Sequence, residues 1–415
     1  MKMRKVLALV VVLTLAVNVL AACGSSTSGT SSNSTTASSS GTESGDTIKL
    51  GVFEPQTGEN GGGGIQELQG ARYANELRPT VKINGKEYKV VLDEVDNKSD
   101  KTEAVTAAQK LVADKVTAVI GTYGSGCAIA AGPTFADAKI PAVGVSCTNP
   151  QVTQGNDYYF RVCFLDPFQG TVMANYAWQQ GYKTAAAISQ LGDDYTSGLA
   201  SYFVKAFEAL GGKVLDNETY QTNQSDFKAI LTNIKEQNVD FLFAPSSIAT
   251  APLIIKQARE LGITAAFGGG DTWYNATIID NASAAYCEGM VCSTFFDEAD
   301  TSSQNTIDFV KGYKEWLNKD QKRIESNGGN DSIVGNTALC FDTYNLICDA
   351  IESCNSTDGK TLRDAIAASN FQGATGAITF DENGDAKRDS AYIDIVKNGA
   401  FEFLKIVSVS DTAKQ

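Results

Sequence analysis

Hydroxyl groups and acids follow several short apolar runs, where they could bind a small polar molecule. Ser125 lies in IGTYGSGCA, at the expected start of a helix of small residues. Ser146 and Thr148 follow the next apolar run in VGVSCTNP. Asp271 follows the glycines of GGGDTW, and Tyr195 lies in GDDYTSGLA. A helix start offers free backbone N–H groups and the positive end of the helix dipole, so the Ser125 segment favours an anion.

The patterns of nucleotide-binding loops do not fit this segment. Counted from Gly121, the P-loop spacing meets Cys127 where a lysine is needed. Counted from Gly124, the dinucleotide pattern breaks at Ile129. A single carboxylate needs only backbone N–H groups and a hydroxyl, which the segment provides. For Ser125 taken alone, a plain helix cap is the alternative.

The polar residues together predict a ligand with two opposite charges. Ser146 and Thr148 add hydroxyl and backbone groups to the Ser125 rim, whereas Asp271 supplies an acid from the second half of the chain. A carboxylate receptor that faces a lone acid across a cleft suits a zwitterion. The sequence therefore predicts an α-amino acid as the ligand.

Apolar runs that alternate with amphipathic stretches must position these residues. Such runs read as strands because they are short and rich in β-branched residues, and the stretches between them carry apolar residues at helical spacing. Two successive series of this kind predict an α/β protein with two doubly wound parallel-sheet lobes and a cleft at the carboxyl ends of the strands. The expected strands cover residues 47–53, 88–95, 116–121, 140–145, 183–190, 212–220, 240–245 and 264–270.

Composition excludes several classes of function. The formal net charge of −14 makes nucleic acids and anionic lipid surfaces poor partners. The sequence contains no histidine, so Ser-His-Asp and Cys-His nucleophile pairs and histidine metal ligands are excluded. The acids of GDDY have no nucleophile, metal or phosphate partner beside them in the sequence. We therefore expect neither an enzyme nor a cofactor.

The N-terminal residues are expected to be a targeting segment. The apolar run 6–20 follows a basic start and is too short to span a membrane. It ends in LAAC, which resembles the lipobox of bacterial lipoproteins. The resemblance implies a signal peptide over 1–22 and a lipid on Cys23 that anchors the protein to the outer face of the cytoplasmic membrane. An ordinary secretory signal is the alternative. Residues 23–46, rich in Ser, Thr and Gly, are expected to be a flexible tether.

The remaining cysteines favour buried free thiols, since most of them lie within apolar runs. No pair has tandem CxxC spacing, and DENGD lacks the ligand spacing of a calcium loop, so no metal site is expected. These cysteines are Cys127, Cys147, Cys163, Cys287, Cys292, Cys340, Cys348 and Cys354.

From residue 47 to the end, the chain resembles the amino-acid-binding proteins of branched-chain amino acid ABC transporters. These proteins have the type I periplasmic binding fold, which they share with metabotropic glutamate receptor ectodomains. Each motif alone is weakly specific, but together they occur in the order of the family. The motifs are PQTGENGGGG, IGTYGSGCA, IPAVGVSCTNP, YFRVCFLDPFQG, DDYTSGLA, QARELGI, GGGDTW and GATGAITFDENGD.

The resemblance implies a role for each candidate residue. Ser125 and Thr148 would hold the substrate carboxylate. The Ser146 carbonyl and the Asp271 carboxylate would hold the ammonium group, and Tyr195 would close over the ligand.

The resemblance also implies two discontinuous, hinged lobes. Lobe 1 would contain residues 47–165 and about 296–376, and lobe 2 residues 166–295 and about 377–415. The segment RVCFLD would carry one crossing between the lobes. The C-terminal β segments, including ITFDENGD with its Asn383-Gly384 turn, would complete the second lobe.

Two positions depart from the leucine-binding members. Gly63 and Ser247 align where those proteins have aromatic walls. The loss of two rings predicts vacant space for a longer or more polar ligand side chain, or for a bridging water. For the glycine run 61–64, simple loop flexibility is the alternative.

The sequence thus predicts a monomeric, lipid-anchored solute-binding protein that delivers an amino acid to the permease and ATPase of an ABC transporter. Two alternatives stay open. One is a ligand-sensing receptor domain that works without a transporter. The other is a binder of an amide, urea, sugar or other small polar solute.

Overall fold

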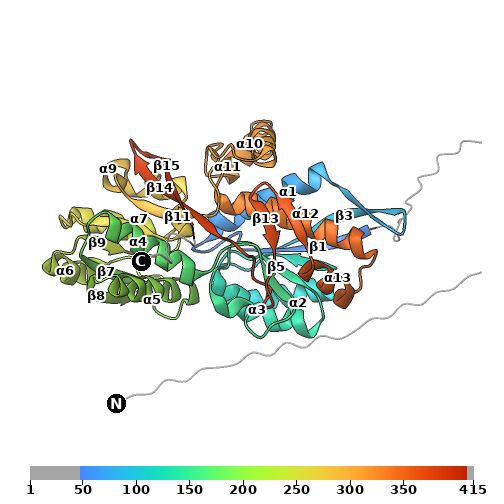
Figure 1. Ribbon diagram of the computed structural model, residues 1–415, viewed down its shortest axis with the longest axis horizontal. Coiled ribbons are helices and arrows are strands. Elements are labelled where there is room, and N and C mark those ends of the chain that lie inside the picture. The colour runs from blue at the N-terminus through green and yellow to red at the C-terminus, as the bar shows by residue number, and fades with distance from the viewer. Residues whose placement is uncertain (1–46, 409–415) are drawn as a thin grey trace, which may run out of the picture. The chain divides into compact units, whose positions relative to one another are not determined.

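Two separate β-sheets organise the computed structural model, which describes residues 47–408 (Figure 1). A small third sheet pairs β12 (Asn370–Gly373) with β13 (Gly376–Thr379). The expected signal peptide, the tether and Cys23 lie outside the described residues. Within 47–408, no helix is long and apolar enough to cross a membrane.

The first sheet has the strand order β2-β3-β1-β4-β5-β6. All of its pairings are parallel except that of the edge strand β2 with β3. Asn84 and Gly85 turn the chain between these two strands with φ of 50° and 80°. The strands are β1 (Thr47–Glu54), β2 (Thr80–Ile83), β3 (Lys86–Asp96), β4 (Ala118–Ile120), β5 (Ala142–Gly144) and β6 (Tyr159–Arg161).

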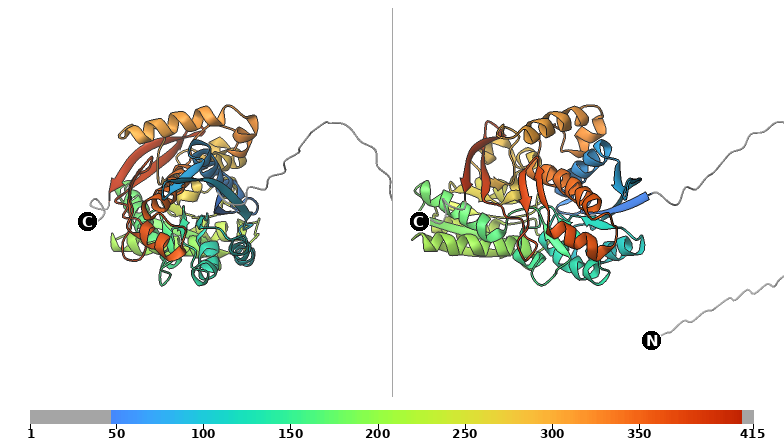
Figure 2. Two further views of the ribbon diagram at one scale, coloured as in Figure 1. Left: turned by 90° about the vertical axis from the view of Figure 1, so that its right-hand side faces the viewer. Right: turned by 45° about the vertical axis from the view of Figure 1, so that its right-hand side comes forward.

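Helices cover both faces of the first sheet because its strands carry apolar residues on alternate faces. Leu50 and Val52 pack with α1 (Gly61–Leu77) and α12 (Gly335–Cys354), whereas Phe53 packs with α2 (Lys101–Ala113) and α3 (Ser125–Asp137). Figure 2 shows the orange α12 beside the blue N-terminal elements, where it packs against α1 and β2. The remaining helices of this lobe are α10 (Gln304–Leu317), α11 (Gln321–Ser326) and α13 (Gly359–Ala367).

The second sheet has the strand order β15-β14-β11-β10-β9-β7-β8. Strands β7 to β11 pair in parallel, and the C-terminal strands β14 and β15 add to the β11 edge in antiparallel pairing. The strands are β7 (Thr184–Gln190), β8 (Lys213–Tyr220), β9 (Phe241–Phe243), β10 (Ala266–Gly269), β11 (Val291–Thr294), β14 (Ser390–Lys397) and β15 (Ala400–Ser408).

This sheet also buries both of its faces. Phe241 and Phe243 pack toward α4 and α5, whereas Leu242, between them, packs toward α6, α7 and α8. The helices are α4 (Asp166–Gln179), α5 (Asp194–Ala209), α6 (Lys228–Gln237), α7 (Ala251–Glu260), α8 (Ala276–Ala282) and α9 (Ala284–Cys287).

The chain passes between the lobes after β6, after β11 and before β14, and contacts join these crossings to one another. The Arg388 guanidinium donates to the Val162 carbonyl at 2.8 Å. The rings of Phe164 and Phe295 lie 4.3 Å apart between their centroids. The expected crossing in RVCFLD therefore lies beside the other two.

The segment that follows β13 differs from the expectation. Ile378, Phe380 and Ala386 pack in the core of the first lobe, and Arg161 donates its backbone N–H to the Gly384 carbonyl at 3.0 Å. The Asn383-Gly384 turn exists, with φ of +85° at Gly384, but this segment belongs to lobe 1. The expected boundary near residue 376 is too early, because a turn signal does not specify which sheet the turn packs against.

The fold class is confirmed as two doubly wound, mainly parallel α/β lobes. The cysteines from Cys127 to Cys354 are all free, and only Cys354 is partly exposed, which confirms the expectation of buried thiols for the described part of the chain.

Candidate functional site

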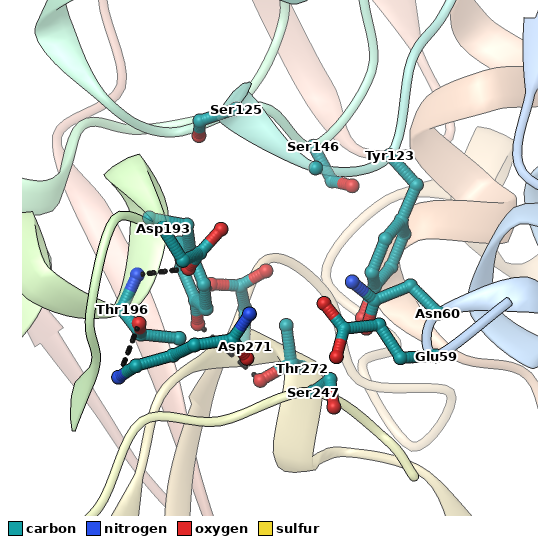
Figure 3. A pocket seen from close by; sticks show the side chains of 13 residues that line it. Glu59, Asn60, Tyr123, Ser125, Ser146, Asp193, Thr196, Ser247, Asp271 and Thr272 are labelled. Atoms are coloured by element: carbon teal, nitrogen blue, oxygen red, sulfur yellow. Dashed lines mark hydrogen bonds between the residues drawn. The ribbon is translucent and has the colours of Figure 1, made fainter. Parts of the chain in front are cut away.

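A small polar pocket lies where the carboxyl ends of strands from both sheets meet. Open α/β sheets bind ligands at this edge. Figure 3 shows the labelled side chains arranged around its open centre. The lining residues are Glu59, Asn60, Tyr123, Gly124, Ser125, Ser146, Gln190, Asp193, Tyr195, Thr196, Ser247, Asp271 and Thr272.

Ser125 is the first residue of α3, and Gly124 before it has φ of 94°, a conformation that favours glycine. The Ser125 hydroxyl does not cap the helix. It accepts the backbone N–H of Asn149 at 3.1 Å and so fixes the loop after β5. Because the α3 N-terminus has no side-chain cap, its first N–H groups are available to an anion.

Ser146 follows β5 and donates its hydroxyl to the buried carboxyl of Glu67. Glu54, also fully buried, accepts the Tyr123 backbone N–H at 2.7 Å. Burial raises the pKa of Glu67 to about 8. Burial and the nearby Glu67 charge raise the pKa of Glu54. At neutral pH this pair therefore holds at least one proton, and together the two acids fix the backbone at Tyr123 and the side chain of Ser146.

Asp271 begins the 3₁₀ turn Asp271–Trp273 after β10. Its Oδ1 accepts hydrogen bonds from Gln169 Nε2 at 2.7 Å and from the Tyr195 hydroxyl at 2.9 Å. Burial raises the pKa of Asp271 to about 6, although these two hydrogen bonds favour the ionised form. The carboxylate is thus ionised at neutral pH in a poorly solvated place, where a cation would relieve its desolvation.

The structure brings Ser125, Ser146, Tyr195 and Asp271 into one lining, but not Thr148. Thr148 is fully buried, and its carbonyl accepts the Asp166 backbone N–H at 3.0 Å.

A buried ion pair supports the loop that carries Ser146 and Thr148. Arg161 Nε pairs with Asp385 at 2.5 Å, and Nη1 donates to the carbonyls of Cys147 and Asn149. The Arg161 side chain is completely buried. The loop is therefore positioned by a residue of β6 and by the hairpin that sequence analysis assigned to the wrong lobe.

The two expected specificity positions behave differently. Ser247 lines the pocket, with its hydroxyl donating to Thr250 at 2.9 Å. Gly63 does not line it, and a Cβ there would lie 2.6 Å from the Tyr123 ring and 3.0 Å from Ile248. The Tyr123 ring fills the space expected to be vacant at Gly63, so that part of the expectation is wrong. The glycine run is also not a loop, because Gly61–Gly64 forms the first turn of α1.

Several polar residues of the lining are not among those predicted from the sequence, notably Glu59, Asn60, Gln190 and Thr196. All of them follow, or end, a strand that had been predicted, so the same positional rule applied more broadly would have found them. Asp193 caps α5, because its carboxylate accepts the Thr196 backbone N–H at 2.8 Å.

Contacts between the lobes border the pocket. Asn149 Nδ2 donates to the Asp194 carbonyl at 2.7 Å, and Lys101 pairs with the Asp194 carboxylate at 2.7 Å. Near Ser247, the Ala249 backbone N–H donates to the Glu59 carbonyl at 3.2 Å. The lobes thus meet on more than one side of the pocket.

Two doubly wound lobes with a polar pocket between their strand ends define a two-lobed solute-binding protein. Residues 47–400 match the family described as periplasmic binding protein, and the chain belongs to this family. It is 27% identical over 347 residues to the leucine-, isoleucine-, valine-, threonine- and alanine-binding protein of Pseudomonas aeruginosa. This alignment covers 82% of this chain and 88% of that relative.

Solved structures agree with this assignment. The leucine-binding protein LivK of Thermotoga maritima is 33% identical, with a TM-score of 0.81 over 88% of this chain and 99% of that one. LivJ of Streptococcus pneumoniae, a branched-chain amino acid transporter protein solved with isoleucine, is 27% identical, with a TM-score of 0.78 over 87% and 99%. The family resemblance drawn from the sequence motifs is confirmed.

Proposed function

We propose that this protein binds an α-amino acid between its lobes and delivers it to the permease and ATPase of an ABC transporter. The observation that carries the proposal is that the uncapped N-terminus of α3, in lobe 1, and the partly buried carboxylate of Asp271, in lobe 2, line the same pocket. The first suits a carboxylate, and the second suits an ammonium group.

The carboxylate end of the ligand would bind the first N–H groups of α3 beside Ser125. Such a site needs no cationic side chain, because backbone N–H groups and the helix dipole supply the positive potential. The ammonium group would bind Asp271, whose carboxylate is oriented by Gln169 and Tyr195. With one acceptor oxygen shared by these two donors, the other oxygen, Oδ2, stays available to the ligand.

The relatives support a transport role. Proteins named for binding leucine, isoleucine and valine match the chain along most of its length. The matched family consists of extracytoplasmic solute-binding proteins rather than enzymes. On this basis we propose a monomer that works outside the cytoplasm without catalysis or cofactor. If the protein is instead a receptor that works without a transporter, its gene should have no permease and ATPase genes beside it.

Calorimetry with ligands that lack one charged group tests the proposal. 4-Methylpentanoate is leucine without its amine, and isoamylamine is leucine without its carboxylate. If the pocket binds a zwitterion, a panel of amino acids contains a ligand whose amine-less and carboxylate-less analogues bind at least ~10²-fold more weakly. Tighter binding of benzoate, urea or a sugar than of every amino acid would contradict the proposal.

We further propose that the lipid on Cys23 anchors the protein to the outer face of the cytoplasmic membrane. The support is the LAAC sequence after an apolar run. Fractionation of cells that produce Cys23→Ser tests it, because the variant is expected to leave the membrane fraction or to keep its leader. Normal processing with unchanged membrane retention would contradict this proposal.

A further inference from the structure

The lining of the pocket is more acidic than a neutral amino acid requires. Glu59, Asp193 and Asp271 all line it, and none of the described lining residues is a lysine or an arginine. The same lining contains no leucine, isoleucine, valine, methionine, phenylalanine or tryptophan. A branched aliphatic side chain would thus find the rings of Tyr123 and Tyr195 but no aliphatic side chain to pack against.

One of the three acids is already assigned to the α-ammonium group, which leaves two. Glu59 comes from the loop between β1 and α1, and Asp193 from the turn between β7 and α5, so they approach the ligand from opposite lobes. Neither forms an ion pair with any described residue. They are close enough to interact, because burial and then the negative charge of Asp193 raise the pKa of Glu59. In Figure 3 the side chains of both point toward the open centre of the pocket.

The pocket also continues past these two acids. Glu59 and Asp193 line a larger neighbouring hollow, whereas Ser125 and Asp271 do not. A ligand held by its α-amino acid group at Ser125 and Asp271 would therefore extend its side chain between Glu59 and Asp193.

Lys101 is the only lysine or arginine among the described residues that line the pocket or the hollow, and it is paired with another acid. Lys101 lines the outer hollow, but its Nζ pairs with Asp194 at 2.7 Å and donates to the Gly192 carbonyl at 2.9 Å. Asp100, next to it in the chain, lines the same hollow and adds a further carboxylate. The excess negative charge along the path therefore remains.

We propose, on the basis of the function proposed above, that the bound amino acid has a long side chain that ends in an ammonium or guanidinium group, held between Glu59 and Asp193. Two carboxylates without cationic partners match such a group, because a buried charge is stabilised only when it is paired and hydrogen-bonded. The Tyr123 ring, which lines both the pocket and the hollow, offers an additional face for a cation.

Calorimetry with charge-matched ligand pairs tests the proposal. Arginine and citrulline have similar length and shape, but only arginine is cationic at neutral pH. Lysine and norleucine form a second such pair. We expect the cationic member of at least one pair to bind ~10-fold or more tightly than its neutral partner, and more tightly than leucine.

Variants of the two acids locate the effect. Glu59→Gln and Asp193→Asn should each weaken the cationic ligand ~10-fold and its neutral partner less than ~3-fold. In Asp193→Asn the amide oxygen can still accept the Thr196 N–H, so the start of α5 is preserved. Glu236→Gln, on the exposed face of α6, changes the net charge equally and serves as the control.

The possible results separate this inference from the function on which it rests. If leucine or another neutral amino acid binds as tightly as arginine and lysine, the cationic side chain is refuted and amino acid binding stands. Equal losses for cationic and neutral ligands in both variants would also refute it. If no amino acid binds, both proposals fall.

Discussion

Replacing Asp271 with asparagine should stabilise the ligand-free protein while weakening ligand binding. Asparagine keeps the Oδ1 acceptor for Gln169 and Tyr195 but removes the negative charge from this partly buried position. Burial raises the pKa of Asp271 from 3.8 to about 6. At neutral pH the ionised group therefore costs the folded state about 3 kcal/mol, at about 1.4 kcal/mol per pH unit.

The sign of the pH dependence follows from that pKa. Between pH 3.8 and about 6 the folded protein binds more protons at Asp271 than the unfolded chain, so this group's contribution to stability decreases as pH rises. We expect the variant to unfold at nearly the same temperature as the wild type at pH 4. At pH 7 it should unfold roughly 4 °C higher, from an unfolding entropy of about 2.1 cal/mol/K per residue.

Thermal unfolding at both pH values, with calorimetry alongside, measures the two effects together. Asp394, whose pKa burial raises to about 9, titrates in both proteins and cancels in the difference. The pKa of Glu67, which burial raises to about 8 with a smaller contribution from the Asp271 charge, should fall slightly in the variant. Ser125→Ala is the control, since its hydroxyl does not titrate and its stability difference should not change with pH. Amino acid affinity should fall ~10²-fold in Asp271→Asn at pH 7. A variant that unfolds at a lower temperature than the wild type at pH 7, or that binds the ligand equally well, would refute the reasoning.

Three further predictions concern packing and motion. Gly64→Ala should destabilise the protein by ~1–3 kcal/mol in denaturant unfolding, because the new Cβ would lie 2.0 Å from a backbone carbonyl; Gly62→Ala, with no atom within 4 Å, should be neutral or stabilising. Arg161→Met should cost ~3–5 kcal/mol because it leaves the Asp385 carboxylate buried without its partner, and the double variant with Asp385→Leu should recover part of that loss; a double variant less stable than the single one would contradict this. Small-angle scattering should give a smaller radius of gyration with saturating ligand than without it, and identical curves would argue against a hinged pair of lobes.

The sequence predicts the strands and most of the lining because both depend on local signals. Apolar runs of strand length alternate with helical periodicity, and the rule that ligands bind at strand carboxyl ends then selects Ser125, Ser146, Tyr195 and Asp271. The expected strand over 88–95 forms, but its hairpin partner β2 is not predicted, although the Asn84-Gly85 turn between them is a strong local signal.

The remaining features depend on contacts between residues far apart in the chain. Nothing local in ITFDENGD specifies that it packs beside Tyr159 and Arg161 rather than on the second sheet. The position of the Tyr123 ring beside Gly63 also depends on how α1 packs near β4. Tertiary packing therefore sets the space available to a ligand side chain. Alignment of motifs alone predicts that space incorrectly, as it does at Gly63.

The contacts of Asp194 with Asn149 and Lys101 affect how quickly the protein binds and releases its ligand. These contacts involve no ligand atom, so they favour the closed arrangement whether the pocket is filled or empty. Every 1.4 kcal/mol or so that they contribute lowers the fraction of empty protein open to solvent about tenfold. Ligand enters only through that fraction, and a bound ligand must wait for the same contacts to break before it escapes. A strong Asp194 contact would therefore slow both ligand binding and ligand release. A transporter that pulls the lobes apart would break the contact and make release fast again at the membrane.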